Sequence, residues 1–284
     1  MSTSYDASFL LVGLPDAGKT NFIVALDVVL ENQGDPDGWV GDTFAPDRNY
    51  LAPLKATWLA GEELIRTNPS VGEEVAILRA RDPKSNRVAE LLLPDLLGET
   101  FRQQWELRRW HKDYRERLSK ISGILLFVNC KDCATLNQIP RQWPLDLDVN
   151  QNLQALNWDL KYAPRQMKIV DLLQFIVESG EVPRPLRVAL ILSAWDVVDK
   201  PEVMLPKEPT AYLKKEWPLI YQYCESNLEL ITFRTFGVSA RGGDDTDLPA
   251  LLRLPGPCDR IKVVDGSHVS HDLTRPIRWL FDAL

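Results

Sequence analysis

A chain of 284 residues with a formal net charge of −7 has room for one large domain or two small ones. Its lysines and arginines form no extended block, which argues against a nucleic-acid partner or an anionic membrane surface. No stretch reaches the roughly 18 apolar residues that a membrane-spanning helix requires. The first residues lack the basic region of a signal peptide, and four cysteines do not make a disulfide scaffold, so we expect a cytoplasmic protein.

The first motif lies between an expected strand and an expected helix. Residues 7–12 form an apolar run of strand length, and residues 21–30 carry apolar side chains at helical spacing. Between them, residues 13–20 (GLPDAGKT) match the pattern G-x-x-x-x-G-K-[ST]. Such a turn aims backbone N–H groups toward the positive end of the helix dipole, which favours a phosphate. We therefore predict nucleotide binding here, rather than an ordinary turn in which Lys19 is solvated.

This motif also assigns individual roles. The lysine of the pattern, Lys19, reaches the β- and γ-phosphates, and the hydroxyl of Thr20 contacts Mg²⁺. The residues predicted to line the phosphates are Gly13, Pro15, Asp16, Ala17, Gly18, Lys19, Thr20 and Asn21.

The next elements are an amphipathic helix and a hairpin. Residues 31–38 are rich in turn formers, and residues 48–67 place apolar side chains on one helical face. Residues 74–81 and 87–94 read as two strands joined by turn chemistry at 82–86, which predicts an antiparallel hairpin.

The remainder alternates between helices and strands. Residues 130–163 are irregular, and we interpret them as an insertion and a candidate cap of the site. The other expected elements are a helix at 101–120, a buried strand at 124–129, a helix at 166–179, a buried strand at 186–192, a helix at 210–227 bent at Pro218, a strand within 228–238, a loop at 242–270 and a closing helix at 272–284.

This order predicts an α/β fold with a mostly parallel sheet, one antiparallel hairpin strand, and helices on both faces. We expect a single domain over residues 1–284, with insertions at about 44–72, 130–163 and 242–268. Ligands of such sheets bind at the carboxyl ends of the strands, so the residues there are the candidates for function.

The second strand of the hairpin ends in an acidic motif. Asp95, Gly98 and Glu99 follow this strand, and Asp95 with Gly98 matches D-x-x-G. A carboxylate at this position supports Mg²⁺, and the glycine N–H contacts a γ-phosphate whose presence orders the loop. A simple strand-ending turn is the alternative, but the position directly after the hairpin favours the functional interpretation.

Two later strands end in residues 193–196 (SAWD) and 236–240 (FGVSA). With these motifs the chain resembles the P-loop GTPases of the Ras-like and translation-factor (TRAFAC) class, over nearly all of its length except the three insertions. The resemblance implies a three-layer Ras-like fold. In this family the aspartate of the motif N-K-x-D accepts hydrogen bonds from guanine N1 and N2, and Asp196 matches this position. The alanine N–H of the motif S-A-x donates to guanine O6, and Ser239 and Ala240 match this motif.

The match to N-K-x-D is incomplete. Ser193 and Ala194 stand where the family has asparagine and lysine, and the missing lysine removes an aliphatic cover over the base. The resemblance implies that the base is held by Ser193, Trp195, Asp196, Ser239 and Ala240, and it leaves ATP open as an alternative to GTP.

Two further roles follow from the resemblance. Thr43 is the best-placed residue for the switch threonine that joins Mg²⁺ and the γ-phosphate, and a solvated loop threonine is the equal alternative. Glu99 stands where Ras-like enzymes carry the water-positioning glutamine. Because a carboxylate accepts from water but cannot donate, we expect slow or partner-dependent hydrolysis, unless Glu99 is a surface acid at a helix start.

The sequence GLPDAGK is also similar to the G-L-P-N-A-G-K loops of cation-activated GTPases, whose asparagine helps to hold K⁺ beside the phosphates. Asp16 replaces this asparagine. A carboxylate can also coordinate K⁺, but its charge opposes the triphosphate, so activation by K⁺ stays an open alternative.

The proline-rich chain, its long insertion and residues 273–280 (LTRPIRWL) resemble the double-GTPase proteins of bacterial conflict and phage-defence gene clusters. This narrower resemblance implies a switch that acts with a protein partner, such as a second GTPase. A zinc site from the pairs Cys130/Cys133 and His268/His271 is disfavoured because their separation is far outside the range of zinc fingers.

Together these features predict a GTP-binding protein that hydrolyses GTP to GDP and phosphate with Mg²⁺ and acts as a molecular switch. One alternative is an interaction module that stays loaded with nucleotide without turnover, as Glu99 and Ser193-Ala194 suggest. An ATPase is the other, although the hairpin directly before Asp95 is the GTPase arrangement.

Overall fold

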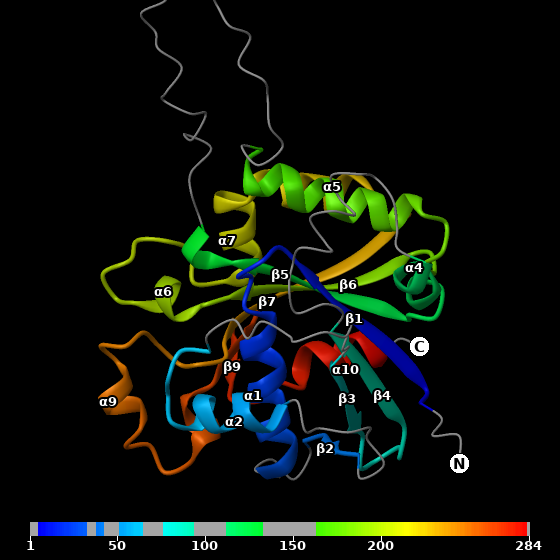
Figure 1. Ribbon diagram of the computed structural model, residues 1–284. Helices are drawn as coiled ribbons and strands as arrows, with labels where there is room; N and C mark the ends of the chain where they lie inside the picture. The colour runs from blue at the N-terminus through cyan, green and yellow to red at the C-terminus, as the bar shows by residue number, and fades with distance from the viewer. Residues whose placement is uncertain are drawn as a thin grey trace, which may run out of the picture.

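The structure, a computed structural model, describes residues 5–32, 38–42, 51–64, 76–93, 112–132 and 163–282. These residues form one nine-stranded sheet with the order β2-β3-β4-β1-β5-β6-β7-β8-β9 (Figure 1). The strands are β1 (Ala7–Gly13), β2 (Val40–Gly41), β3 (Ala76–Arg81), β4 (Val88–Leu93), β5 (Gly123–Asn129), β6 (Leu186–Ser193), β7 (Ile231–Ser239), β8 (Lys262–Asp265) and β9 (His268–Ser270).

Helices connect these strands and cover the sheet. They are α1 (Lys19–Asn32), α2 (Leu51–Leu59), α4 (Lys112–Leu118), α5 (Arg165–Glu178), α6 (Asp196–Asp199), α7 (Pro209–Glu216), α8 (Pro218–Ser226), α9 (Leu248–Leu251) and α10 (Arg275–Phe281), with the 3₁₀ turns η1 (Cys130–Asp132) and η3 (Pro257–Arg260). None of the helices described is long and apolar enough to cross a membrane.

The centre of the sheet is parallel. β1 lies between β4 and β5, with Phe9 opposite Leu91 on one side and Gly123 on the other. β6 and β7 continue the sheet beyond β5 in the same direction. The apolar runs of these strands fit this position, because a central parallel strand is buried on both faces. The predicted α/β class, with a mostly parallel sheet, is confirmed.

The predicted hairpin is also present, formed by β3 and β4. Its turn uses the chemistry expected from the sequence. The Asp82 carboxylate accepts a hydrogen bond from the Lys84 N–H at 3.0 Å, and Asn86 adopts a left-handed conformation with φ of 57°. Because β3 runs against β4, it ends the parallel part of the sheet on this side.

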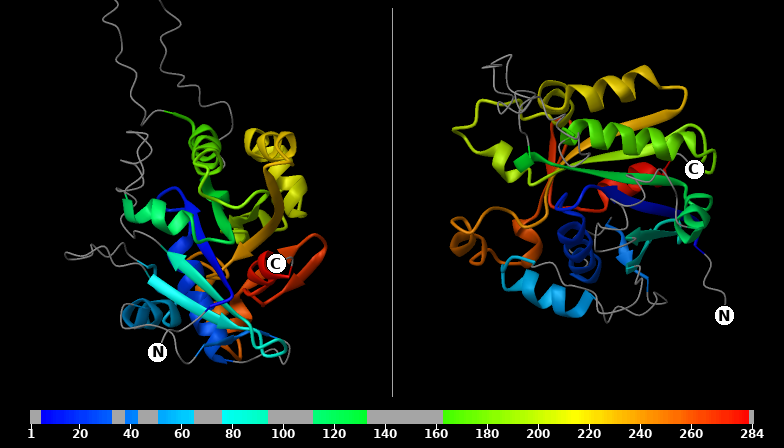
Figure 2. Two further views of the ribbon diagram at one scale, coloured as in Figure 1. Left: turned by 90° about the vertical axis from the view of Figure 1, so that its right-hand side faces the viewer. Right: turned by 45° about the horizontal axis from the view of Figure 1, so that its top comes forward.

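Helices cover both faces of the sheet (Figures 1 and 2), and a separate core of side chains packs on each face. On β5, Leu125 and Phe127 belong to a core with α1, α2 and α10, whereas Leu126 and Val128 belong to a core with α4, α5, α7 and α8. This alternation is the period-2 side-chain pattern of a strand that is covered on both sides. The three-layer arrangement follows from it.

The helix expected at 210–227 is divided where proline predicts a bend. Trp217 leaves the helical region, with φ of −127° and ψ of 52°, and Pro218 begins α8. Proline has no N–H for the helical ladder, so the first helix ends before it. α7 begins with a cap in which the Glu208 carboxylate accepts from the backbone N–H of Thr210 at 2.9 Å.

The prediction that residues 242–270 form a loop without helices or strands is wrong. This stretch contains α9, η3, β8 and β9, and β8 pairs antiparallel with the end of β7, with Val263 opposite Val238. β2 likewise adds a short antiparallel strand beside β3. The local composition is rich in glycine, proline and aspartate and favours a loop, but the open edge of β7 provides a pairing partner that composition does not reveal.

Candidate functional site

The loop of residues 13–20 lies between the carboxyl end of β1 and the start of α1. Two of its glycines are required by close contacts. A Cβ on Gly13 would lie 2.8 Å from the Phe127 carbonyl oxygen, and one on Gly18 would lie 3.0 Å from the Cβ of Ser193. Gly18 and Asp16 also have positive φ angles, of 86° and 63°. The loop is therefore pressed against the ends of β5 and β6.

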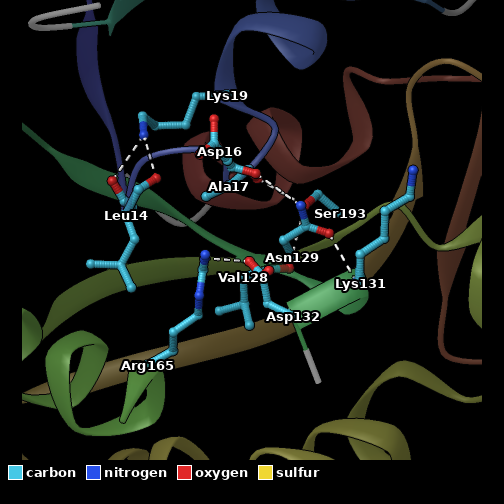
Figure 3. A network of polar contacts seen from close by, with 11 residues as sticks. Leu14, Asp16, Ala17, Lys19, Val128, Asn129, Lys131, Asp132, Arg165 and Ser193 are labelled. Atoms are coloured by element: carbon cyan, nitrogen blue, oxygen red, sulfur yellow. Dashed lines mark hydrogen bonds and ion pairs between the residues drawn. The ribbon is translucent and has the colours of Figure 1, made fainter. Parts of the chain in front are cut away.

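Lys19 closes the loop from within. Its ammonium donates hydrogen bonds to the carbonyl oxygens of Gly13, at 2.8 Å, and Leu14, at 2.9 Å (Figure 3). The Ala17 N–H donates to the Leu14 carbonyl at 3.2 Å. These contacts hold the ammonium across the mouth of the turn, directly beside the N-terminus of α1.

Two neighbouring strands also hold the loop through polar side chains at their ends (Figure 3). The Asn129 amide, at the end of β5, donates to the Asp16 carbonyl at 2.8 Å. The Ser193 hydroxyl, at the end of β6, donates to the Ala17 carbonyl at 2.8 Å. Sequence reasoning missed Asn129, although a polar residue that ends a buried strand beside the loop strand was a usable signal.

These contacts orient the backbone of the loop. The carbonyls of Gly13 and Leu14 accept from the Lys19 ammonium, and those of Asp16 and Ala17 accept from side chains at the ends of β5 and β6. The start of α1 adds the positive end of its dipole beside the loop. Both features suit the anion-binding turn that the sequence predicts.

The end of β6 continues into the predicted base-binding segment. Ala194 has a positive φ of 53°, and the Trp195 N–H donates to the Val238 carbonyl of β7 at 3.2 Å. The Trp195 indole is fully buried, packed edge-on against Tyr212 at 5.3 Å and directly against Gly237. The indole therefore lies in the core.

Asp196 begins α6 and faces the end of β7. Its Oδ1 accepts a hydrogen bond of 2.6 Å from the Ser239 hydroxyl, whose oxygen in turn accepts from the Gly242 N–H at 3.1 Å. The second oxygen, Oδ2, is buried and has no hydrogen-bond partner among the residues that the structure describes. A buried carboxylate oxygen without a donor is costly.

Ion pairs join the two loops that follow β6 and β7. The Lys200 ammonium lies 2.8 Å from an Asp244 carboxylate oxygen, and Lys262 pairs with Asp199. The hydrogen bond from Lys200, with another from Thr246, lowers the pKa of Asp244 well below its usual range. The same contact raises the pKa of Lys200. The segment after β6 is therefore joined by ion pairs both to the loop after β7 and to the start of β8.

A second acid lies near the loop of residues 13–20. Asp132, in η1, pairs with Arg165 at the start of α5 (Figure 3). Burial raises the pKa of Asp132, and the negative charge of Asp16 raises it further, while the ion pair with Arg165 opposes both effects. The loop of residues 13–20, called the phosphate loop below, therefore has a second carboxylate near Asp16, and Arg165 offsets the charge of that carboxylate.

The remaining predicted residues lie partly inside and partly outside the described chain. Thr20 and Asn21, both half-buried, occupy the first turn of α1, and Pro15 is half-buried in the loop. The structure places Ala240 directly after β7, next to Ser239. Four predicted residues lie outside the described residues, namely Thr43, Asp95, Gly98 and Glu99.

The disfavoured zinc alternative gains no support from the described residues. Cys130 is buried in the core beneath η1, and Nδ1 of His271 lies 2.6 Å from the Ile261 carbonyl. Across the described ranges, three or more metal-ligating side chains do not gather at any point. Cys133 lies outside these ranges.

A family model described as "Double-GTPase 1" matches residues 10–280. No curated protein matches the sequence.

Two solved structures are similar to the chain. One is a bacterial selenocysteine-specific elongation factor, EF-Sec, with 13% identity and a TM-score of 0.37 over 87% of this chain and 28% of that one. The other is translation elongation factor SelB from Methanococcus maripaludis in complex with the GTP analogue GppNHp, with 12% identity and a TM-score of 0.37 over 86% of this chain and 32% of that one. The chain thus spans less than a third of the length of either factor.

Proposed function

Because the chain belongs to the Double-GTPase 1 family, we propose that it binds GTP with Mg²⁺, hydrolyses it to GDP and phosphate, and acts as a molecular switch. The family match covers residues 10–280 and confirms the resemblance to P-loop GTPases. It also supports the proposal that the protein works with a partner, such as a second GTPase in a multi-protein bacterial defence system.

One observation carries this proposal: three motifs that are far apart in the sequence are bonded to one another at a single edge of the sheet. Ser193 joins the end of β6 to the phosphate loop at Ala17, and Ser239 joins the end of β7 to Asp196. The proposed phosphate site and the proposed base site would thus be adjacent, at the carboxyl edge where open α/β sheets bind ligands.

The phosphate groups would be held by the loop amides and by Lys19. The ammonium now shares its hydrogen bonds between two carbonyl oxygens. Exchange of these partners for β- and γ-phosphate oxygens would replace neutral acceptors by charged ones, and hydrogen bonds between ionised groups are roughly twice as strong. The same ammonium would offset the charge that develops during phosphoryl transfer.

The donor set at the start of α1 fits Mg²⁺, which takes oxygen ligands. The Thr20 hydroxyl is half-buried beside Lys19, and we propose Thr43 and Asp95 as the other protein groups that hold the ion. When bound, Mg²⁺ would neutralise phosphate charge.

The base would be recognised by the unpartnered oxygen of Asp196 and by the Ala240 backbone. Guanine offers N–H donors at N1 and N2, whereas adenine offers none at the matching positions. The buried Oδ2 of Asp196 supports a guanine preference, because it is an acceptor that an adenine base would leave unsatisfied.

Hydrolysis would depend on the placement of water more than on special chemistry. Glu99 is the proposed water acceptor, and because its carboxylate cannot donate, turnover is expected to be slow or to depend on a partner. Asp16 could hold K⁺ beside the phosphates, but Asp132 adds a second acid nearby, which Arg165 counters.

The decisive experiment identifies by mass the nucleotide that co-purifies with the protein and then compares the affinities of GDP, GTP, ADP and ATP. We expect guanine nucleotides to bind at least ten times more tightly than adenine nucleotides. Tighter ATP binding, or no nucleotide binding, would overturn the proposal.

A second measurement separates the switch from the non-catalytic module. Phosphate release is followed with Mg²⁺ in K⁺ and in Na⁺ buffers, with and without a co-expressed second GTPase. Sustained release supports the GTPase, and a K⁺-dependent rate supports activation by K⁺. Stable GTP loading without release in every condition supports the interaction module.

A further inference from the structure

Helix α2 ends at a glycine in a left-handed conformation. Gly61 has a φ of 78°, its N–H donates to the Trp58 carbonyl at 3.0 Å, and the Glu62 N–H donates to the Thr57 carbonyl at 3.1 Å. This pair of hydrogen bonds is the Schellman motif, in which a left-handed glycine stops the helix. The negative end of the α2 dipole therefore lies at Trp58 and Gly61.

Two arginines from the last quarter of the chain bind this helix end. The Arg241 guanidinium donates to the Gly61 carbonyl through Nη2 at 2.7 Å and through Nε at 3.2 Å. Arg260, which is buried, donates to the Trp58 carbonyl at 2.6 Å, and its guanidinium lies 3.9 Å from the centre of the Trp58 ring. Cations at a helix C-terminus are stabilising, and stacking on tryptophan adds to this effect.

Arg241 belongs at the same time to the proposed base-binding loop. It directly follows Ser239 and Ala240, and the Gly242 N–H that comes after it donates to the Ser239 hydroxyl oxygen at 3.1 Å. The Arg241 guanidinium is oriented further by Asp245, whose carboxylate oxygen lies 2.6 Å from Nη2. One short loop therefore contacts Asp196 on one side and α2 on the other.

The middle of the same helix is held by α1. Lys55 lies 3.5 Å from the buried carboxylate of Asp27, and it also pairs with Glu31. Leu51, Leu54 and Trp58 are buried in the core that α1 shares. α2 thus bridges the helix that begins at the phosphate loop and the loop that follows β7.

We propose that Arg241 is a positioning residue that couples the base-binding loop to α2, so that a guanine nucleotide bound at Asp196 and Ala240 also restrains this helix. The inference rests on the proposed function, because it requires a guanine nucleotide at that loop. A ligand that restrains residues 239–242 also restrains the Arg241 guanidinium and, through it, the Gly61 carbonyl. Since coupling between two sites is reciprocal, a firmly placed α2 in turn strengthens nucleotide binding.

The test compares the unchanged protein with Arg241→Met, which keeps the apolar stem of the side chain but removes its donors. GDP affinity is measured by calorimetry, and hydrogen exchange of the peptide that covers residues 51–61 is measured with and without GDP. In the unchanged protein we expect GDP to slow exchange in this peptide. In Arg241→Met we expect this slowing to be lost and GDP affinity to fall about 10-fold, the size of a charged hydrogen bond.

Two further variants sharpen the comparison. Arg253→Ala, at an exposed arginine of the same C-terminal segment, should behave as the unchanged protein does. Arg241→Lys keeps the charge with a single donor group, so it should recover part of the affinity and part of the protection. If Arg241→Met does not fold, Asp245→Asn takes its place, because Asp245 is exposed and orients the guanidinium; we then expect about a 2-fold loss of affinity and weaker protection of α2.

The outcomes separate this inference from the function on which it rests. If the unchanged protein binds no GDP, the proposed function fails. A different result would overturn the coupling through Arg241 and leave the proposed function standing. In that result GDP binds tightly and slows exchange in α2 equally in the unchanged protein and in Arg241→Met. The same comparison applies to Asp245→Asn where it replaces Arg241→Met.

Discussion

The Ser239 hydroxyl donates a 2.6 Å hydrogen bond to Oδ1 of Asp196, although 43 positions separate the two residues in the sequence. Ser239 is the last residue of β7 and Asp196 follows β6, and these two strands are neighbours in the sheet. The bond satisfies one carboxylate oxygen, while the other is buried without a hydrogen-bond partner among the described residues. The serine therefore determines which way the aspartate faces.

Removal of this hydroxyl should weaken nucleotide binding without unfolding the protein. In Ser239→Ala, Oδ1 of the Asp196 carboxylate loses its donor and the side chain gains freedom. We expect GDP affinity to fall by about 1–1.5 kcal/mol, roughly 10-fold, as measured by calorimetry. Ser119→Ala, at an exposed serine after α4, is the matched control. Equal GDP affinity in Ser239→Ala and this control would show that the bond does not serve the base site.

The replacement of Asp196 by asparagine should change which base is preferred. Asn offers an N–H donor where the aspartate offers an acceptor, so it no longer matches the guanine amino group and instead matches the carbonyl that xanthine carries at C2. We expect Asp196→Asn to bind XDP at least 10-fold more tightly than GDP. Competition between the two nucleotides measures this, and an unchanged preference for GDP would remove Asp196 from base recognition.

Two strand-end side chains should differ in how strongly they support the phosphate loop. Ser193 is 7% exposed and contacts the Ala17 carbonyl, so Ser193→Ala leaves a buried acceptor unsatisfied. Asn129→Ala removes the donor to the Asp16 carbonyl, which water can replace because this bond is exposed. We expect a loss of GDP affinity of about 1–3 kcal/mol for Ser193→Ala and under about 1 kcal/mol for Asn129→Ala. The reverse order in calorimetry would contradict this view of the loop.

Gly237 and Trp195 should behave as a coupled pair. A Cβ on Gly237 would lie 2.7 Å from Cε2 and 2.8 Å from Cγ of the Trp195 indole, so Gly237→Ala overpacks the core. We expect it to lower the free energy of unfolding by about 1–3 kcal/mol.

The double variant Trp195→Leu/Gly237→Ala tests whether the contact itself is the cause. Leucine is smaller than tryptophan, so the added methyl group should cost less in that background than in the unchanged protein. Chemical denaturation of the two single variants and the double variant measures the coupling. Additive losses would mean that the cost of Gly237→Ala arises from the backbone instead.

The Lys200–Asp244 pair predicts a particular pH dependence. The pKa of Asp244 is lowered in the folded protein, so the pair contributes stability above the ordinary aspartate pKa of about 3.9 and loses it as the pH falls through the lowered value. The difference in unfolding free energy between the unchanged protein and Lys200→Met should be constant from pH 5 to 8 and should shrink below about pH 4. Since both side chains are solvated, the difference is expected to be small. A difference that changes between pH 6 and 8 would point to another group.

Local sequence signals predicted most of the elements correctly. The β3–β4 hairpin follows from its turn residues, and the break between α7 and α8 follows from Pro218, because both depend on the conformations of a few adjacent residues. β8 was missed for the opposite reason. Its four residues become a strand only because the end of β7 offers an open edge.

In the candidate site, too, the sequence indicated local features but not how distant parts of the chain meet. The roles of Thr43, Asp95, Gly98 and Glu99 stay predictions, as do the single-domain boundaries and the insertions at about 44–72, 130–163 and 242–268. Trp195 was expected beside the base because of its place in the motif, yet its indole lies in the core against Gly237. A motif position specifies where the backbone runs, but it does not specify which way a large side chain turns.

The sequence by itself determined that a strand, a glycine-containing turn and a helix follow one another at residues 7–30, because the steric needs of glycine and the spacing of apolar residues are local properties. Only the tertiary structure decided what supports this loop and what is coupled to it. Asn129, Ser193 and Arg241 acquire their roles from carbonyl groups 113, 176 and 180 positions away. Such contacts depend on which strands become neighbours, and that is settled by the packing of the whole sheet.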